Sequence, residues 1–186
     1  MTTPLAFRPV DTVTWPDLVR LFESPGGPKH CWCMVWRRSA AEAKQREGAA
    51  RRAMLEARVA RGDPIGLVGT LADEPVAWVS IAPRETYRPL GAADDLPPGE
   101  RVWSLVCFFL KRKHRGEGRV AELIAAAVAE AKARGATLVE AYPVEPDAPS
   151  YRFMGFVPSF AAAGFTPAGR AGTRRHVMRL RLPGDA

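Results

Sequence analysis

The residues from Val102 to Gly135 constrain the fold more than any other part of the chain. Residues 102–110 form an apolar, partly aromatic run of strand length that contains neither glycine nor proline. A basic turn with two glycines follows. Residues 119–134 then place apolar side chains at helical spacing and are followed by a glycine, a common helix stop. The sequence therefore predicts a buried strand, a basic glycine turn and a helix, in that order.

The turn between this strand and this helix has the composition of an anion-binding site. The first N–H groups of a helix have no partner within the helix, and the helix dipole makes that end positive. Gly116 and Gly118 would let an anion approach the backbone, and the basic residues 111–115 add positive potential. We therefore expect a phosphate or pyrophosphate here. The glycine loop of nucleoside triphosphatases is absent, and the dinucleotide fingerprint lacks its third glycine.

The same stretch resembles the acetyl-CoA site of the GNAT superfamily of N-acetyltransferases. The family pattern is Gln or Arg, two residues, Gly, one residue, then Gly or Ala. It corresponds here to Arg115-Gly116-Glu117-Gly118-Arg119-Val120. The resemblance implies that these six residues bind acetyl-CoA, although Val120 is larger than the family's usual residue. It also implies that the preceding strand offers backbone groups to the pantetheine arm at Phe108, Phe109 and Leu110.

The rest of the chain supplies elements in the order of that family. Besides 102–110, we predict strands at 6–10, 65–71, 76–81, 137–144 and 174–182, and helices at 15–23, 39–61, 119–135 and 158–163. The predicted fold is a single α/β (α+β) GNAT domain over residues 1–186. Its central sheet is mixed but mostly antiparallel, with about six or seven strands and about four flanking helices.

Composition limits the partners. The chain of 186 residues is 47% hydrophobic and has no apolar run near the roughly 20 residues of a membrane span. Its three cysteines, an odd number, fit a reducing compartment, so we expect a cytoplasmic protein that does not contact membranes. The net charge of +7 fits a phosphorylated ligand or an arginine-rich proteome. A basic nucleic-acid-binding domain is an alternative, but no motif supports it. Whether the chain forms a homodimer stays open.

The family's last helix ends in an aromatic residue, three residues, then Gly-Phe. The sequence offers two such pairs, at residues 155–156 and 164–165, and we favour the second. Many relatives carry a Tyr four residues before that Gly, whose hydroxyl protonates the departing thiolate. Phe160 occupies this position, so we assign the acid role to Tyr151, with Ser159 as an outside candidate. The missing hydroxyl also leaves open a non-catalytic CoA-binding protein.

The segment around Cys31-Trp32-Cys33 has two interpretations. By its place in the GNAT fold it would line the acceptor side of the cleft, with Trp32, Cys33 and Trp36 binding substrate. Free cysteines and tryptophans are equally typical of a packed core. A structural zinc site needs four ligands at wider cysteine spacing, and no second ligand pair stands out, so we expect no metal.

The GNAT resemblance implies direct attack of an amine on the acetyl-CoA thioester. Such a reaction needs a base for the ammonium and an N–H group for the oxyanion. Glu140 is the preferred base because it is a single carboxylate within an apolar strand, and Glu145 and Glu100 are alternatives. Tyr142 would shape the substrate pocket. The acceptor amine, whether a small amine, an antibiotic or a peptide, is not specified by the sequence.

Overall fold

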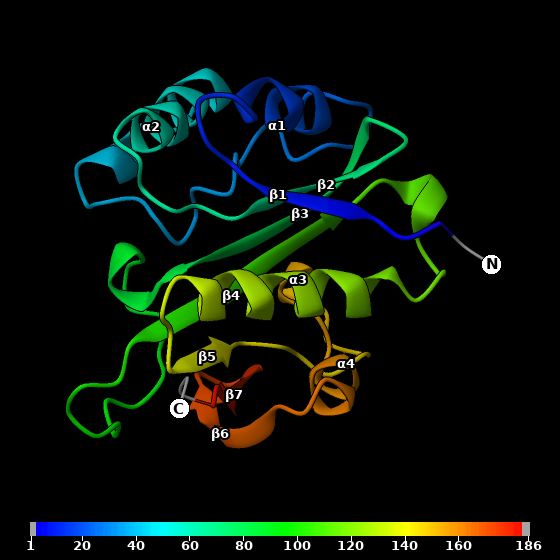
Figure 1. The fold of residues 1–186 in the computed structure, drawn as a ribbon. Helices are drawn as coiled ribbons and strands as arrows, with labels where there is room; N and C mark the ends of the chain where they lie inside the picture. The colour runs from blue at the N-terminus through cyan, green and yellow to red at the C-terminus, as the bar shows by residue number, and fades with distance from the viewer. Residues whose placement is uncertain (1–2, 184–186) are drawn as a thin grey trace.

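The computed structural model describes residues 3–183 and contains one seven-stranded sheet (Figure 1). The strand order is β1-β2-β3-β4-β5-β7-β6. All neighbouring strands are antiparallel except β4 and β5, so the predicted mixed, mostly antiparallel sheet is confirmed. The strands are β1 (Ala6–Pro9), β2 (Leu67–Leu71), β3 (Glu74–Pro83), β4 (Val102–Leu110), β5 (Leu138–Ala141), β6 (Thr166–Ala171) and β7 (Arg175–Arg181).

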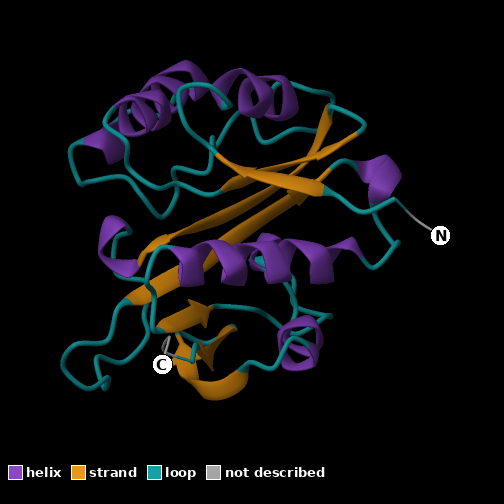
Figure 2. Cartoon of the chain, in the orientation of Figure 1, coloured by secondary structure: helices purple, strands orange, loops and turns teal. Residues whose placement is uncertain are grey.

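Four α-helices cover the two faces of the sheet (Figures 1 and 2). They are α1 (Trp15–Phe22), α2 (Gly48–Ala60), α3 (Arg119–Ala133) and α4 (Val157–Ala162). Helices α1 and α2 lie on one face, and α3 and α4 lie on the other. Four short 3-10 helices complete the structure: η1 (Glu42–Lys44), η2 (Arg84–Thr86), η3 (Arg112–His114) and η4 (Arg152–Met154). Among the described helices, none is long and apolar enough to cross a membrane.

The second helix is shorter than the sequence predicted. We expected a helix over residues 39–61, but α2 begins only at Gly48. Ser39 and Glu42 hydrogen-bond each other's backbone N–H groups and close a separate turn. Both carboxylate oxygens of Glu42 also accept hydrogen bonds from Arg58 on α2, at 2.9 Å each. This tertiary contact folds the segment back against α2, which helix propensity could not reveal.

Each helix pair buries an apolar stripe against the sheet. Leu123, Ile124 and Ala127 of α3 are at most 1% exposed and pack on the central strands. On the other face, Leu18 and Leu21 of α1 pack around Trp78 with other large side chains. Complete burial of one such leucine or isoleucine contributes about 1.5–3 kcal/mol. These two apolar layers hold the central strands β3 and β4 in place, and those strands position the site.

A third buried cluster packs against the loop that follows η2. Its members come from this loop, β4, β7 and the chain after β5, and include Tyr87, Leu90, Tyr142, Met154 and Val177. This cluster borders the part of β4 that has lost its neighbour β5. It therefore forms one wall of the candidate site.

Candidate functional site

Strands β4 and β5 run together for only part of their length. Their parallel pairing begins at Val102 with Leu138 and ends at Leu105 with Ala141, although β4 continues to Leu110. The pairing of β4 with β3 is also irregular at this point, because Ser80 pairs with Cys107 and Ile81 with Leu105. Val106 is therefore the extra residue of a β-bulge. Bulges bend a strand and are frequent beside active sites.

Beyond the bulge, β4 has a strand neighbour on one side only. Leu110, Phe109 and Phe108 still pair with β3. Backbone groups that point to the other side have no strand to bind, and such groups need another polar partner. Cys107, Phe108 and Phe109 are half-buried here, whereas Leu105 before the bulge is fully buried. This half of β4 thus has backbone groups without a strand partner in a partly open environment.

The glycine turn lies at the end of this open half of β4. Gly116 and Gly118 have φ values of +81° and +74°, which side chains other than glycine rarely adopt. A Cβ atom added at either position would meet no atom within 4 Å. Within the described residues, the N–H groups of Gly116, Glu117 and Gly118 donate no hydrogen bond. Open space and unpaired donors at the start of α3 fit the pyrophosphate of a nucleotide cofactor.

Two arginines of the turn use their side chains within the protein. Arg115 donates from Nε to the carbonyl oxygen of Leu110 at 2.9 Å. Arg119 is only 3% exposed and donates to Glu117, to Glu122 and to the carbonyl of Thr3. Glu122 in turn accepts a hydrogen bond from the N–H of Leu5. These contacts fasten the N-terminal segment to α3, so Arg119 has only its backbone N–H to offer a ligand.

Part of the positive charge of the turn is neutralised. Lys111 and Lys113 both form ion pairs with Glu74, at 2.9 and 3.0 Å. Hydrogen bonds from these lysines lower the pKa of Glu74 to about 2. Arg112 and Arg115 are exposed at the same turn. The turn therefore remains basic, and both of its lysines are paired with Glu74.

Comparison with known proteins decides the family. The sequence model of the acetyltransferase (GNAT) family matches residues 25–156, which is more than half of the chain. The chain belongs to the GNAT acetyltransferase family. The match begins after α1, includes β4, the glycine turn and η4, and ends at the first Gly-Phe pair. No curated protein sequence matches the chain significantly.

Solved structures agree with a GNAT fold. A ribosomal-protein-alanine N-acetyltransferase from Brucella melitensis is 19% identical, with a TM-score of 0.57 over 96% of this chain and all of that one. The protein yncA from Salmonella typhimurium, solved with its cofactor acetyl-CoA, is 16% identical, with a TM-score of 0.57 over 99% and 97%. An N-acetyltransferase from Staphylococcus aureus is 14% identical, with a TM-score of 0.57 over 97% and 100%. These low identities establish the fold alone.

The last GNAT helix ends at the second Gly-Phe pair, as the sequence predicted. Helix α4 contains Phe160, Gly164 follows it with φ of +88°, and β6 begins at Thr166. Phe160 is completely buried and packs against Phe108, with 5.9 Å between ring centroids. The first pair lies beside it, since a Cβ on Gly155 would be 2.8 Å from the Phe160 ring. Gly155 and Phe160 therefore both lie against Phe108 of β4.

Tyr151 lies at the start of η4 and is accessible. It is 37% exposed and has a φ of +61°, a left-handed conformation that is unusual for a tyrosine. Its ring is 6.4 Å from Trp36 and 6.3 Å from Phe153. Residues held in such conformations cluster at functional sites. Its role as an acid stays a prediction.

Glu140 is fully buried, and its carboxylate has three polar side chains as neighbours. Its Oε2 atom accepts a hydrogen bond from Nε of Arg179 at 2.8 Å, and its Oε1 atom accepts one from the hydroxyl of Tyr142. Arg84 lies 3.7 Å from Oε1. Burial, followed by the charge of Glu140, raises the pKa of Tyr142. The predicted base and the predicted pocket tyrosine are thus in direct contact, although their roles remain predictions.

The two alternative bases bind other groups. Glu145 is exposed and forms a pair of 2.8 Å with Nε2 of His176. Glu100 precedes β4, far from its open end, and binds Arg181 and Thr137. Neither carboxylate contacts the bulge or the aromatic residues around Tyr151. Among the three candidates, Glu140 alone hydrogen-bonds another predicted site residue within the described chain, whereas Glu100 lines the larger pocket together with Tyr142.

Residues 32–36 divide between core and site. Trp32 is 2% exposed and packs against Trp15 and Phe22, at 5.9 and 5.3 Å between ring centroids. Cys33 is buried and accepts a hydrogen bond from Nε1 of Trp78 at 3.3 Å. These positions favour the core interpretation for both. Trp36 is half-buried and lies beside Tyr151, and its role in substrate binding stays a prediction.

The buried Cys33 and the half-buried Cys107 interact with each other. A hydrogen bond from Cys107 lowers the pKa of Cys33 to about 6, and the same contact raises the pKa of Cys107. Within residues 3–183, no group of three or more His, Cys, Asp or Glu side chains is arranged to hold a metal ion.

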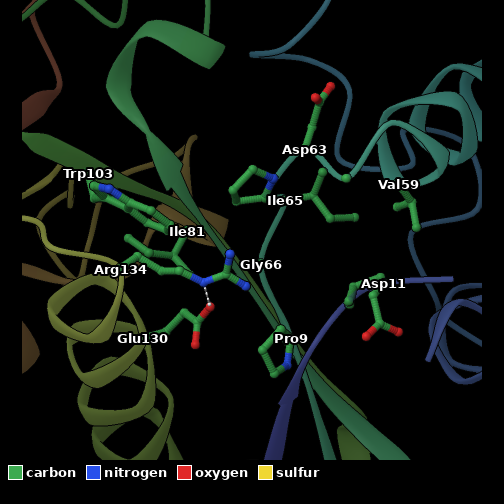
Figure 3. Close-up of a pocket in the computed structure, with 13 residues that line it drawn as sticks. Pro9, Asp11, Val59, Asp63, Ile65, Gly66, Ile81, Trp103, Glu130 and Arg134 are labelled. Carbon is green, nitrogen blue, oxygen red and sulfur yellow. Dashed lines mark hydrogen bonds and ion pairs between the residues drawn. The ribbon is translucent and has the colours of Figure 1, made fainter. Parts of the chain in front are cut away.

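Two of the pockets in the structure differ in size and in position relative to the glycine turn. A small one of about 160 Å³ is lined by Pro9, Asp63, Trp103 and Arg134, among others (Figure 3). It sits at the end of α3, whereas the glycine turn is at its start, about 20 Å away at 1.5 Å per residue. A larger one of about 560 Å³ lies below the loop after η2 and is lined by Arg88, Leu90 and Tyr142.

Sequence reasoning missed two residues beside the larger pocket. Arg88 and Arg175 both lie over the ring of Trp36, at 5.5 and 4.6 Å from the ring centroid. Arg88 comes from a loop and Arg175 from the start of β7. The sequence contains many arginines, and no pattern distinguishes these two. Only the tertiary structure brings them together.

Proposed function

We propose that the chain moves an acetyl group from acetyl-CoA to a primary amine, by direct attack within a ternary complex. The observation that carries this proposal is the open half of β4. There the strand has left β5 at a bulge and ends at a glycine turn with unobstructed, unpaired N–H groups. An extended thioester with an anionic end needs this combination: strand-like backbone groups along its arm and a helix start at its phosphates.

Each part of the ligand has a matching part of the chain in this proposal. The N–H groups of Gly116, Glu117 and Gly118 would hold the pyrophosphate, together with those of Arg119 and Val120 at the start of α3. The backbone of Phe108, Phe109 and Leu110 would bind the pantetheine arm. Arg115 would support this by holding the Leu110 carbonyl in place. Acetyl-CoA, when bound, supplies an activated acyl group.

The catalytic groups follow from the same arrangement. Glu140 would take the proton of the ammonium, directly or through water, while a backbone N–H of β4 stabilises the oxyanion. Tyr151 would donate a proton to the departing sulfur. Trp36 and Tyr142 would border the acceptor. The contact between Tyr142 and Glu140 supports a shared role in positioning the amine.

Thermal unfolding and thiol release test the proposal. Acetyl-CoA at about one hundred times its dissociation constant should stabilise the fold by about 2.7 kcal/mol and raise Tm. A panel of small amines, aminoglycosides and peptides should contain at least one acceptor that accelerates thiol release over hydrolysis. Absence of any Tm shift with millimolar acetyl-CoA would contradict the proposal.

A non-catalytic CoA-binding protein is the second candidate, and one observation favours it. Phe160 has no hydroxyl at the position where many relatives have one, and it is completely buried. This candidate predicts a Tm shift with CoA but no thiol release with any amine. The thiol-release panel therefore separates the two.

A further inference from the structure

Arg88 and Arg175 form a pair of cations stacked on one aromatic side chain. Their guanidinium carbons lie 5.5 and 4.6 Å from the ring centroid of Trp36. Arg175 also lies 5.3 Å from the ring of Tyr151 and 6.0 Å from that of Tyr142. Cation–π contacts of this kind fix a guanidinium but do not neutralise its charge. We refer to these two residues as the arginine pair.

The arginine pair has no carboxylate partner within residues 3–183. Nη1 of Arg175 donates to the carbonyl oxygen of Leu90 at 2.8 Å, and neither arginine forms an ion pair with a described acidic residue. Burial, and then the nearby charge of Arg88, lower the pKa of Arg175. Two like charges that are partly removed from water repel each other unless an anion lies between them.

Three acidic residues nearby already bind other arginines. Arg179 binds both Glu140 and Asp95 at 2.8 Å, and Arg84 binds Asp94 at 3.0 Å. These arginines are therefore neutralised, and Glu100 pairs with Arg181. The exposed Glu85 also lines the larger pocket, but within the described residues it forms no ion pair with either member of the arginine pair. The Nε1–H group of Trp36 is also buried and lacks an acceptor within the described chain.

The arginine pair borders the proposed site. Arg88, Leu90 and Tyr142 line the pocket of about 560 Å³, a volume typical of small-molecule sites. Arg175 contacts both Leu90 and Tyr142. The hydroxyl of Tyr142 donates to Glu140, the proposed base. A ligand in this pocket can therefore reach Arg88 and lie close to Glu140, the proposed base, although Glu85, Asp94 and Glu100 also line the pocket.

We infer that the acceptor is a small amine that also carries an oxyanion, a carboxylate or a phosphate, which binds to Arg88 and Arg175 beside Trp36. This inference rests on the proposed function and names the class of its acceptor. The planar guanidinium fork suits both oxyanions, since it can donate two parallel hydrogen bonds. The rings of Trp36 and Tyr151 provide an apolar surface for the body of the acceptor.

Matched probe pairs test the inference. L-phenylalanine is compared with L-phenylalaninamide, and phosphoethanolamine with ethanolamine. The two pairs separate carboxylate from phosphate, and within each pair only the oxyanion differs. Binding is measured by calorimetry with and without saturating CoA, and turnover by thiol release with acetyl-CoA. In at least one pair, we expect the oxyanion member to have an affinity or a kcat/KM about 10- to 100-fold higher than its partner. This range corresponds to the free energy of a charged hydrogen bond.

Variants assign that preference to the arginine pair. Arg175→Met and Arg88→Met should each remove most of it and leave the acetyl-CoA KM unchanged, and Arg175→Lys should restore only part of it. Arg88 is exposed, so its variant should fold even if Arg175→Met does not. Arg174→Met is the matched control, because the exposed Arg174 binds only Ser150 among the described side chains and should keep the preference.

Each outcome of these experiments either supports or contradicts the inference. Equal behaviour of both members in both pairs, or no binding of any probe at tens of millimolar, overturns the inference. A preference that survives in Arg88→Met and Arg175→Met also overturns it. If oxyanion probes bind through the arginine pair but no amine releases thiol, the inference stands and the proposed acetyl transfer fails.

Discussion

Glu140 of β5 lies directly opposite Arg179 of β7, and the Nε–H of Arg179 donates to its carboxylate at 2.8 Å. The carboxylate is completely buried, so this pair and the Tyr142 hydroxyl replace its hydration. Removing one partner of a buried ion pair leaves the other uncompensated and costs about 3–5 kcal/mol. The proposed base is therefore also a structural residue, and tests of it must separate the two roles.

The first prediction compares the two partners of this pair. Glu140→Gln and Arg179→Met should both lower Tm, because each breaks the same ion pair. Only Glu140→Gln removes the carboxylate, so it should lower kcat by about 10²- to 10⁴-fold, whereas Arg179→Met should keep kcat within about tenfold. Urea unfolding and steady-state kinetics measure the two effects. Equal kcat in both variants would refute Glu140 as the base.

A second prediction concerns the glycine turn. Gly118→Asp forces a side chain into a left-handed conformation and places an anion in the open space before α3. We expect the acetyl-CoA dissociation constant to rise at least tenfold, while acceptor binding changes little. Gly99→Asp, at an exposed loop with a similar φ of +88° and equally open surroundings, controls for backbone strain. Unchanged CoA affinity in a folded Gly118→Asp protein would place the cofactor elsewhere.

Tyr151→Phe tests the proposed acid. The hydroxyl is accessible, and its loss changes little packing because the ring remains beside Trp36 and Phe153. General acid catalysis contributes about 10²- to 10⁴-fold, so kcat should fall within that range at unchanged acetyl-CoA KM. An unchanged kcat would mean that water or Ser159 supplies the proton.

Two tryptophans of one segment should respond differently to the same substitution. Trp32→Ala should destabilise the protein by about 3–5 kcal/mol, because Trp32 is 2% exposed within the α1 and α2 layer. Trp36→Ala should cost less stability and should raise the acceptor KM more than the acetyl-CoA KM. Chemical unfolding and kinetics on purified protein compare them. A large acceptor effect of Trp32→Ala at retained stability would instead support the substrate-wall interpretation.

The pH dependence of stability should reveal the contribution of the ion pair between Glu42 and Arg58. Hydrogen bonds from Arg58 lower the pKa of Glu42 to about 2. A depressed carboxyl pKa gives stability that is complete above the unfolded value, about 4.3, and is lost as pH falls toward 2. Glu42→Gln should therefore lower the unfolding free energy at pH 7, by on the order of 1 kcal/mol after allowance for solvent screening. This difference should shrink as pH falls from 5 to 2.

The exposed Glu56 of α2 provides the control for this experiment. Glu56→Gln removes a charge from the same helix but breaks no ion pair within the described residues. Its unfolding free energy should stay within about 0.5 kcal/mol of the wild type at every pH. The same pH profile for both variants would show that the Arg58 contact contributes nothing measurable.

The sequence by itself determined the central strand, the glycine turn and the following helix, because these depend on local properties. An apolar run of strand length, glycines where φ is positive and helical spacing in α3 are all readable along the chain. The second Gly-Phe pair was readable for the same reason, since Gly164 ends α4 locally. The family pattern added the fold.

Only the tertiary structure decided which side chains meet. Residues 39–47 left the helix because Arg58, a distant residue, binds Glu42. Trp32 and Trp36 are four residues apart, yet one is in the core and the other lies beside Tyr151. Arg88 and Arg175 are 87 residues apart and share one indole ring. Contacts of this kind depend on how distant strands and loops pack against one another. Local sequence patterns do not specify that packing.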